Sequence, residues 1–292
     1  KALDLDFIHE KIELNNFWKL IPPKITPTKS FVFKNNIEHD FNIVISCGRK
    51  SVIPSIYLKK KFKEKIINIH IQDPKVSLTN FDFVVAPEHD GLIGNNVIST
   101  KGAIHYLREN ELEENTSYLK PKIKKEKIVT LVVGGPNKYY DYKPKVLEEI
   151  FSKIKQNFIN NDYQLIFIPS MRTPKNVIDK AKNYFDDHQI IVTEIDKKAY
   201  LSSLGLADHI VVTCDSTSMI SEAAITGKPI YVAHMPHIKN NYRFKKFFEM
   251  FKNLNITKDL GDNLEVWKYE KLNETDRISG YIKSKLKDYD IS

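Results

Sequence analysis

The chain is poor in cysteine and has no long apolar run, and both shortages limit what kind of protein it is. Its 292 residues include 2 cysteines, Cys47 and Cys214, too few for a disulfide framework or a cysteine-based zinc site. Each cysteine follows an apolar run, so we expect both to lie buried at strand ends. No stretch is long enough to span a membrane, and no signal peptide is recognisable. We therefore expect a cytoplasmic protein, with peripheral attachment to a membrane as an alternative.

Basic residues are in moderate excess. The chain has 45 Lys and Arg against 37 Asp and Glu, a formal net charge of +8, which favours anionic partners such as phosphates, nucleic acid or a lipid surface. The lysines are dispersed, and runs such as "KKKFKEK" are most simply solvated helix ends. No nucleic-acid motif and no basic stripe with interleaved aromatic residues is present, so we expect no nucleic-acid partner.

Short apolar runs alternate with longer amphipathic stretches, the pattern of β-α-β units around a parallel sheet. The expected strands are residues 41–46, 66–71, 81–86, 96–100, 128–133, 164–168, 190–193, 209–213 and 229–233. The expected helices are residues 52–63, 143–159, 174–186, 198–205, 217–226, 243–254 and 274–289. The strands of the second half are apolar on both faces, as expected of central strands covered by helices.

The order of these elements predicts an α/β protein with two doubly wound, Rossmann-like domains on parallel sheets. Residues 112–127 are charged and lack apolar periodicity, so we interpret them as an interdomain linker. The predicted domains are residues 1–120 and 121–273, followed by a C-terminal helix within residues 274–292. In such sheets ligands bind beyond the carboxyl ends of the strands, so polar residues there are the candidates for function.

Three strands of the second half are followed by small or polar residues. These residues are Gly134, Gly135 and Asn137 after the first strand, Ser170, Arg172 and Thr173 after the next, and Asp215, Ser216, Ser218 and Met219 after the strand 209–213. Glycine permits a close backbone approach, and arginine offers a planar set of donors to an anion. Each group alone is equally a turn, a surface arginine or a helix cap. Their convergence on one rim of the sheet predicts a phosphate or diphosphate site.

The helix 217–226 carries one further candidate, Glu222. Glu222 lies one turn beyond Ser218 and points back toward the helix start. The small residues Ala223, Ala224 and Gly227 indicate a helix pressed onto the sheet, whereas the alternative is a solvated face with an isolated glutamate. Carboxylates are not clustered as in a metal site, so we expect no metal.

Several motifs together resemble the mitochondrial fission family typified by the plant elongated-mitochondria factor, which has many bacterial relatives. They are "ISCGRKS" (45–51), "IQDP" (71–74), "VAPEHD" (85–90), "NVISTKGAIHYL" (96–107), "VVGGP" (132–136), "SMRTP" (170–174), "ADHIVVTCDSTSMISEAAITGKPIYV" (207–232) and "EVWKYEKLNET" (265–275). The resemblance covers nearly the whole chain, and its most specific part is 207–232. The family usually has a strand and a helix before the region of Lys1, so we expect the native chain to begin upstream.

This family is similar in architecture to GT-B glycosyltransferases, which implies that the two domains face an interdomain cleft. The resemblance implies that Gly134 and Gly135 approach the diphosphate of a nucleotide sugar, that Ser216 and Ser218 donate to phosphate oxygens, and that Glu222 accepts from the ribose hydroxyls. The sequence departs from the family at Met171, where a second arginine is more usual, and near Tyr200, where Asn-Pro-Tyr is more usual.

The first half carries the acceptor-side candidates at the ends of its strands. These residues are Gly48, Arg49 and Ser51, then Gln72 and Asp73. His89 and Asp90 are the catalytic candidates, and His89 is the candidate general base because a neutral imidazole can take a hydroxyl proton near pH 7. The alternative is that His89 and Asp90 only order their loop.

Taken with these residues, the resemblance implies a metal-independent GT-B-type glycosyltransferase that binds a nucleotide sugar, with UDP as the expected nucleotide, and transfers the sugar to an unidentified acceptor. We expect no separate cofactor. One alternative is a sugar-nucleotide epimerase on the same fold. Another is a non-catalytic adaptor that recruits a protein partner or attaches to a membrane.

Overall fold

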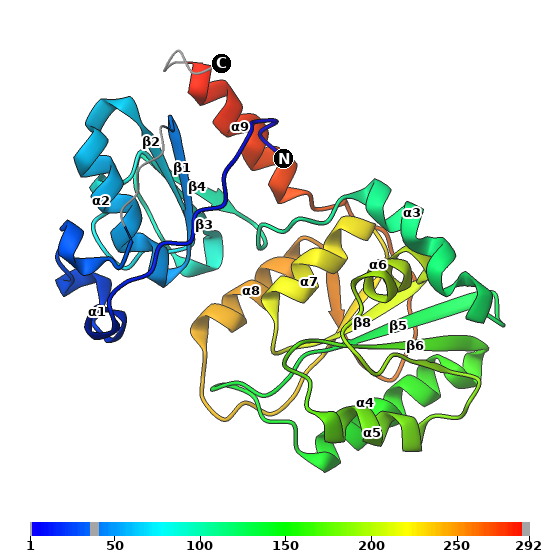
Figure 1. The fold of residues 1–292 in the computed structure, drawn as a ribbon. Coiled ribbons are helices and arrows are strands. Elements are labelled where there is room, and N and C mark those ends of the chain that lie inside the picture. The colour runs from blue at the N-terminus through cyan, green and yellow to red at the C-terminus, as the bar shows by residue number, and fades with distance from the viewer. Residues whose placement is uncertain (1, 36–40, 288–292) are drawn as a thin grey trace. The chain divides into compact units, whose positions relative to one another are not determined.

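The strand-length apolar runs form two parallel sheets in the computed structural model, which describes residues 2–35 and 41–287 (Figure 1). The chain divides into two compact units, residues 1–101 with 274–292 and residues 102–273. Every ladder between named strands of the described residues is parallel. The expectation of an α/β protein on parallel sheets is therefore confirmed.

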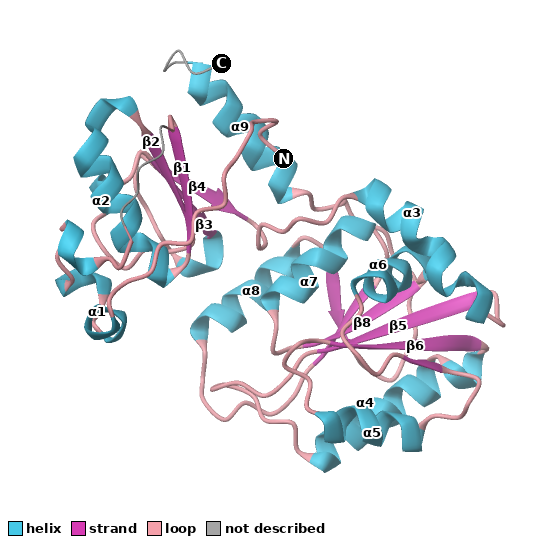
Figure 2. Cartoon of the chain, viewed as in Figure 1, coloured by secondary structure: helices cyan, strands magenta, loops and turns pink. Residues whose placement is uncertain are grey.

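The first unit is built on a four-stranded sheet in the order β1-β2-β3-β4 (Figure 2). The strands are β1 (Ile43–Cys47), β2 (Ile67–Ile71), β3 (Phe83–Pro87) and β4 (Val97–Thr100). Its helices are α1 (Asn16–Leu20), α2 (Val52–Phe62) and α9 (Glu274–Leu286). Val52 and Ile56 of α2 pack with Val84 and Ala86 of β3, and α9 lies against β4. Residues 288 and 289 of the expected C-terminal helix lie outside the described residues.

The second unit is built on a six-stranded sheet in the order β10-β9-β8-β5-β6-β7. The strands are β5 (Lys127–Val133), β6 (Tyr163–Pro169), β7 (Ile190–Ile191), β8 (His209–Thr213), β9 (Ile230–Ala233) and β10 (Thr257–Asp259). The chain runs outward from β5 through β6 to β7, and then returns to β8 on the other side of β5. The sheet therefore has a topological switch point between β5 and β8, the place where open α/β sheets bind ligands.

Helices cover both faces of this second sheet. They are α3 (Glu109–Leu119), α4 (Pro144–Asn157), α5 (Lys175–Tyr184), α6 (Lys197–Leu206), α7 (Thr217–Ala223) and α8 (Tyr242–Asn253). Figure 1 shows α4 and α5 on one face and α6 and α7 on the other. Strands β6 and β8 between them are fully buried, as their sequences predict. No helix among the described residues is both long and apolar enough to cross a membrane.

The expected linker is wrong, because most of it is helical and belongs to the second unit. Residues 109–119 form α3, which packs along α6. Its buried residues Leu112 and Leu119 are two turns apart, too sparse a pattern to show periodicity in the sequence. The close packing depends instead on Gly205 of α6, where an added Cβ would lie 2.7 Å from the carbonyl oxygen of Leu112.

The expected burial of both cysteines is half right. Cys214 is fully buried, but Cys47 is exposed. The strand β1 is an edge strand, and Ile45, which shares a face with Cys47, is 53% exposed. The apolar run before Cys47 therefore predicted the strand correctly, but it did not show that the face of the strand with Ile45 and Cys47 is exposed.

Candidate functional site

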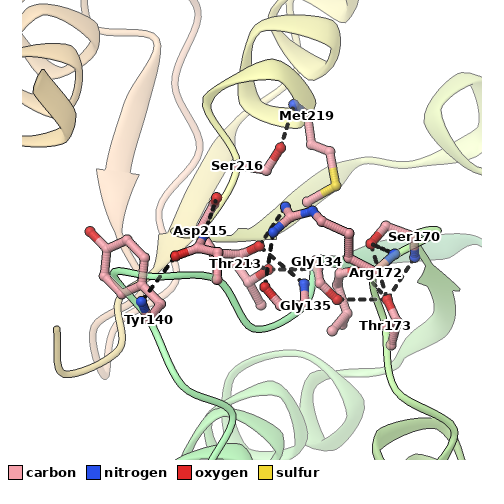
Figure 3. A network of polar contacts seen from close by, with 12 residues as sticks. Gly134, Gly135, Tyr140, Ser170, Arg172, Thr173, Thr213, Asp215, Ser216 and Met219 are labelled. Carbon is pink, nitrogen blue, oxygen red and sulfur yellow. Dashed lines mark hydrogen bonds and ion pairs between the residues drawn. The ribbon is translucent and has the colours of Figure 1, made fainter. Parts of the chain in front are cut away.

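The turns after β5, β6 and β8 meet at the switch point of the second sheet, as the sequence predicted (Figure 3). The Arg172 guanidinium joins the three turns: its Nη2 donates to Asp215 Oδ2 at 2.8 Å and its Nη1 to the Gly135 carbonyl at 3.0 Å. Parallel strands bring their carboxyl ends to one edge, which explains how residues so far apart in the sequence become neighbours.

At the centre of this junction lies the Asp215 carboxylate, whose side chain is 0% exposed. Its Oδ1 accepts from Tyr142 Oη at 2.5 Å and Thr213 Oγ1 at 2.7 Å, and its Oδ2 accepts from Gly135 N at 3.0 Å as well as from Arg172. Four donors thus offset the cost of burying the charge. Burial raises the pKa of Tyr142, and the Asp215 charge raises it further, so Tyr142 stays a neutral donor.

The two glycines are required by packing around Asp215 and Arg172. A Cβ on Gly134 would lie 2.1 Å from Asp215 Oδ2, and a Cβ on Gly135 would lie 1.9 Å from the Arg172 carbonyl oxygen. Their N–H groups donate within the protein, to Thr213 Oγ1 at 2.8 Å and to Asp215 Oδ2. The two amides are therefore already used inside the protein, and the predicted approach of Gly134 and Gly135 to a diphosphate stays a prediction.

Most other predicted residues of this rim support its turns. Thr173 Oγ1 donates toward the carbonyl oxygens of Val133 and Gly134, at 2.8 and 2.6 Å, and Ser170 Oγ accepts from Arg172 N at 3.3 Å. Asn137 Nδ2 donates to the Asp215 carbonyl oxygen at 3.1 Å. These side chains hold Arg172 and the turns in place, and their predicted contacts with a ligand stay predictions.

The start of α7 contributes two serines and a methionine to the same rim. Ser216 is the N-cap, and its Oγ accepts from Met219 N at 3.4 Å. Ser218 is exposed and Met219 is half-buried. The Arg172 side chain is 42% exposed. Arg172 and Ser218 are therefore the predicted residues of this rim that a ligand from solvent reaches most readily.

Glu222 lies further along α7 and is half-buried rather than part of a solvated face. Its Oε2 accepts from Tyr200 Oη at 2.6 Å. Burial raises the pKa of Glu222, while the bond from Tyr200 lowers it by stabilising the carboxylate. The helix is pressed onto the sheet as expected, because Ile220, Ser221 and Ala223 are buried.

The acceptor-side candidates of the first unit lie at the ends of β1 and β2. Ser51 Oγ donates to the carbonyl oxygens of Cys47 and Gly48, at 2.8 and 2.9 Å, and Asp73 accepts from Lys75 N at 2.9 Å. Gly48 has a φ of 76° and Gln72 a φ of 84°. Gln72 is therefore a non-glycine residue in a rarely adopted backbone region, a feature that clusters at functional sites. Arg49 is exposed.

His89 and Asp90 lie in a single turn, Glu88–Asp90, that follows β3 and ends at Gly91 with a φ of 68°. Their side chains are 6% and 4% exposed, and His89 Nε2 lies 3.7 Å from Asp90 Oδ1. This burial agrees with a loop-ordering role. The predicted role as general base stays a prediction.

Three residues that build the site were not among those predicted from the sequence: Thr213, Tyr142 and Tyr200. Thr213 is the last residue of a predicted strand, so its polar side chain at a strand end was the available signal. Tyr142 lies in the loop before α4 and Tyr200 in α6, and nothing in their local sequence shows that they reach Asp215 and Glu222. Among the residues that the structure describes, no group of three or more His, Cys, Asp or Glu residues is arranged to hold a metal ion.

Two UDP-GlcNAc 2-epimerases are among the solved structures to which the chain is similar. UDP-GlcNAc 2-epimerase from Neisseria meningitidis bound to UDP-GlcNAc is 14% identical with a TM-score of 0.49, over 85% of this chain and 76% of that one. UDP-GlcNAc 2-epimerase from Methanocaldococcus jannaschii is 14% identical with a TM-score of 0.47, over 83% and 77% of the two chains. Both TM-scores lie below 0.5, so the family assignment depends on sequence alone.

Two relatives match at the sequence level. Uncharacterized protein RP120 of Rickettsia prowazekii (strain Madrid E) is 26% identical over 84% of this chain and 80% of its own length. Mitochondrial fission protein ELM1 of Arabidopsis thaliana is 24% identical over 84% of this chain, which spans 64% of the Arabidopsis protein. The family model described as Mitochondrial fission ELM1 matches residues 1–286. The chain therefore belongs to the mitochondrial fission ELM1 family.

Proposed function

We propose that the second unit binds a nucleoside diphosphate sugar, with UDP as the first nucleotide to test, at the rim formed by the turns after β5, β6 and β8. The observation that supports this is that the Arg172 guanidinium is held by Asp215 and Gly135 while 42% of the side chain stays exposed. A guanidinium has five N–H donors, and two are used in these contacts, so donors remain for diphosphate oxygens.

The remaining contacts follow from the positions along α7. Ser218 at the exposed start of the helix would donate to a phosphate oxygen, and Glu222 one turn later would accept from the ribose hydroxyls. The reaction that we propose is glycosyl transfer of the GT-B type, in which Arg172 stabilises the charge that develops on the departing diphosphate. Because Asp215 fixes the guanidinium in advance, little reorganisation is needed when that charge appears.

The test is calorimetric titration of the protein with UDP-, GDP-, CMP- and ADP-sugars. One of these should bind, and Arg172→Gln should weaken its binding by about tenfold or more, the range of a lost charge-assisted hydrogen bond. Arg243→Gln removes an exposed arginine of α8 and is the matched control. No heat with any of the four nucleotides, or an unchanged affinity in Arg172→Gln, would overturn the proposal.

A successful titration leaves the reaction to be decided. Incubation with the bound sugar nucleotide and no acceptor separates an epimerase, which converts the sugar, from a transferase, which does not. His89→Gln tests the base on the acceptor side: if His89 takes the acceptor proton, transfer should fall while the affinity for the nucleotide sugar stays the same.

The family itself favours a second candidate, a non-catalytic adaptor, because the Arabidopsis relative is named for mitochondrial fission. An adaptor would keep the fold and recruit a protein partner or attach to a membrane through its basic surface. Glu222→Ala discriminates the two functions. If the wild-type protein binds a nucleotide and this variant does not, the enzyme is supported. If the wild-type protein has no affinity for any nucleotide and the variant still recruits the partner, the adaptor is supported.

A further inference from the structure

The segment 102–107 lies against α7 and presents one exposed aromatic ring. Ala103 N donates to Ser221 Oγ at 2.9 Å, and a Cβ on Gly102 would lie 2.7 Å from the same oxygen. The segment is therefore fixed to the helix at the residue that precedes Glu222. Further along it, His105 and Leu107 are 9% and 2% exposed, whereas Tyr106 between them is 59% exposed. Burial of His105 and Leu107 thus fixes the backbone on both sides of Tyr106, which stays at the surface.

Tyr106 belongs electrostatically to the same cluster as Glu222. Burial raises the pKa of the Tyr106 phenol, and the charges of Glu222 and Glu111 raise it further. Tyr200 joins the cluster, since its hydroxyl donates to Glu222 at 2.6 Å and its own pKa is raised by burial, by Glu222 and by Tyr106. The contacts agree with this grouping, because Lys197, whose ammonium lies over the Tyr106 ring, is one turn before Tyr200 in α6, and Tyr200 is bonded to Glu222.

The cluster has the character of a site for a neutral, flat and hydroxyl-bearing group. Glu222 has no ion pair with a basic side chain among the described residues, and it retains lone pairs beyond the one that Tyr200 occupies. A half-buried carboxylate of this kind favours hydroxyl donors over an anion. Lys197 Nζ lies 4.6 Å from the Tyr106 ring centroid, and 59% of Tyr106 is exposed, which leaves it accessible to a stacking partner.

We propose that Tyr106 is the stacking platform for the nucleobase of the bound nucleotide and that Tyr200 is a positioning residue that holds Glu222 toward the ribose. This inference depends on the proposed function, because it assigns the nucleoside end of the same ligand. The diphosphate end contacts Arg172, and the nucleoside end contacts the cluster of Tyr106, Tyr200 and Glu222.

The experiment measures UDP and ADP binding by calorimetry in the whole chain. Tyr106→Leu should weaken the nucleotide that binds by about fivefold or more, the range expected for loss of one base–aromatic stack, and Tyr106→Phe should keep the wild-type affinity. Tyr281→Leu is the matched control, since Tyr281 is an exposed tyrosine with a lysine, Lys285, near its ring. Tyr200→Phe should weaken nucleotide binding and leave the binding of a ribose-free probe, inorganic pyrophosphate, no weaker than in the wild type.

A spectroscopic signature separates stacking from a structural effect. Base protons of the bound nucleotide should shift upfield in the NMR spectrum because of the Tyr106 ring current, and Tyr106→Leu should abolish this shift. If Arg172→Gln weakens binding but Tyr106→Leu changes neither affinity nor the shift, the inference fails and the proposed function stands. If neither UDP nor ADP nor any sugar nucleotide binds the wild-type protein, the proposed function fails and this inference fails with it.

Discussion

Asp215 is the residue on which the rim of the second sheet depends, because four donors from three segments converge on its buried carboxylate. Asp215→Asn replaces one acceptor oxygen by an amide that cannot accept, so at least one buried donor loses its partner. Since breaking a buried charged network is costly, we expect the free energy of unfolding to fall by about 2–4 kcal/mol. Urea denaturation followed by the fluorescence of Trp267, in the core of the second unit, measures the change.

The control for this prediction is Asp141→Asn, which changes an exposed carboxylate in the loop before α4 and should shift stability by less than about 0.5 kcal/mol. Arg172→Gln should cost less than Asp215→Asn, because Arg172 is partly exposed and Asp215 keeps its three other donors. Equal stability of Asp215→Asn and the wild-type protein would show that the carboxylate does not hold the turns together.

The sequence predicted which residues meet at this rim but not what each of them does there. Arg172, Asp215 and Gly135 could be placed at strand ends because strand boundaries follow from apolar runs. That the Asp215 carboxylate is buried could not be predicted, since it depends on the Tyr142 hydroxyl, which arrives from a loop with no periodic signal. Side-chain contacts between distant segments are set by tertiary packing, which single-sequence patterns do not encode.

At the scale of elements, the contact between α3 and α6 predicts that replacing a helical glycine by alanine destabilises the protein, the opposite of the usual effect. Glycine within a helix normally costs about 1 kcal/mol relative to alanine, so Gly205→Ala in α6 would be expected to stabilise the protein. Here the added Cβ would meet the Leu112 carbonyl oxygen at 2.7 Å and Thr116 Cγ2 at 2.8 Å. The Leu112 backbone cannot move aside without disturbing α3. We therefore expect the free energy of unfolding of the second unit to fall by about 1–2 kcal/mol in Gly205→Ala.

Gly280 in α9 is the matched control for this substitution. An added Cβ at Gly280 meets nothing within 4 Å, so Gly280→Ala should show the ordinary helix-propensity gain of up to about 1 kcal/mol. Urea denaturation of both variants gives the comparison. Stabilisation by Gly205→Ala would mean that α3 is not held against α6, and the interpretation of residues 112–127 as a linker would then have to be reconsidered.

Elements with strong patterns were predictable, and elements held by a few contacts were not. The strands β5, β6 and β8 are continuous apolar runs and were predicted nearly to the residue. In contrast, α3 presents few apolar residues and contains many charged ones, and its place depends on a glycine that lies more than 80 residues later. The short edge strand β10 has the sequence Thr-Lys-Asp, which has no apolar run at all.

At the scale of the whole molecule, each unit contains one of the 2 tryptophans, so the unit that holds a ligand can be identified in solution. Trp18 packs with Phe17 and Phe31 in the first unit, and Trp267 packs against Tyr231 in the second. Trp18→Phe and Trp267→Phe each leave a single reporter. A ligand that binds the folded state stabilises the unit that binds it, by about 2.7 kcal/mol at a concentration 100 times its Kd.

We therefore expect the nucleotide that binds in the titration to raise the unfolding midpoint reported by Trp267, as measured in the Trp18→Phe variant. Arg172 and Ser218, which we propose to donate to the ligand, belong to the second unit, as does Glu222. Ligand binding should therefore stabilise this unit. Arg172→Gln in the same background should remove most of the shift. A nucleotide that raises the midpoint of Trp18 but not that of Trp267 would place the ligand on the first unit, and the rim around Arg172 would then have to be abandoned as its site.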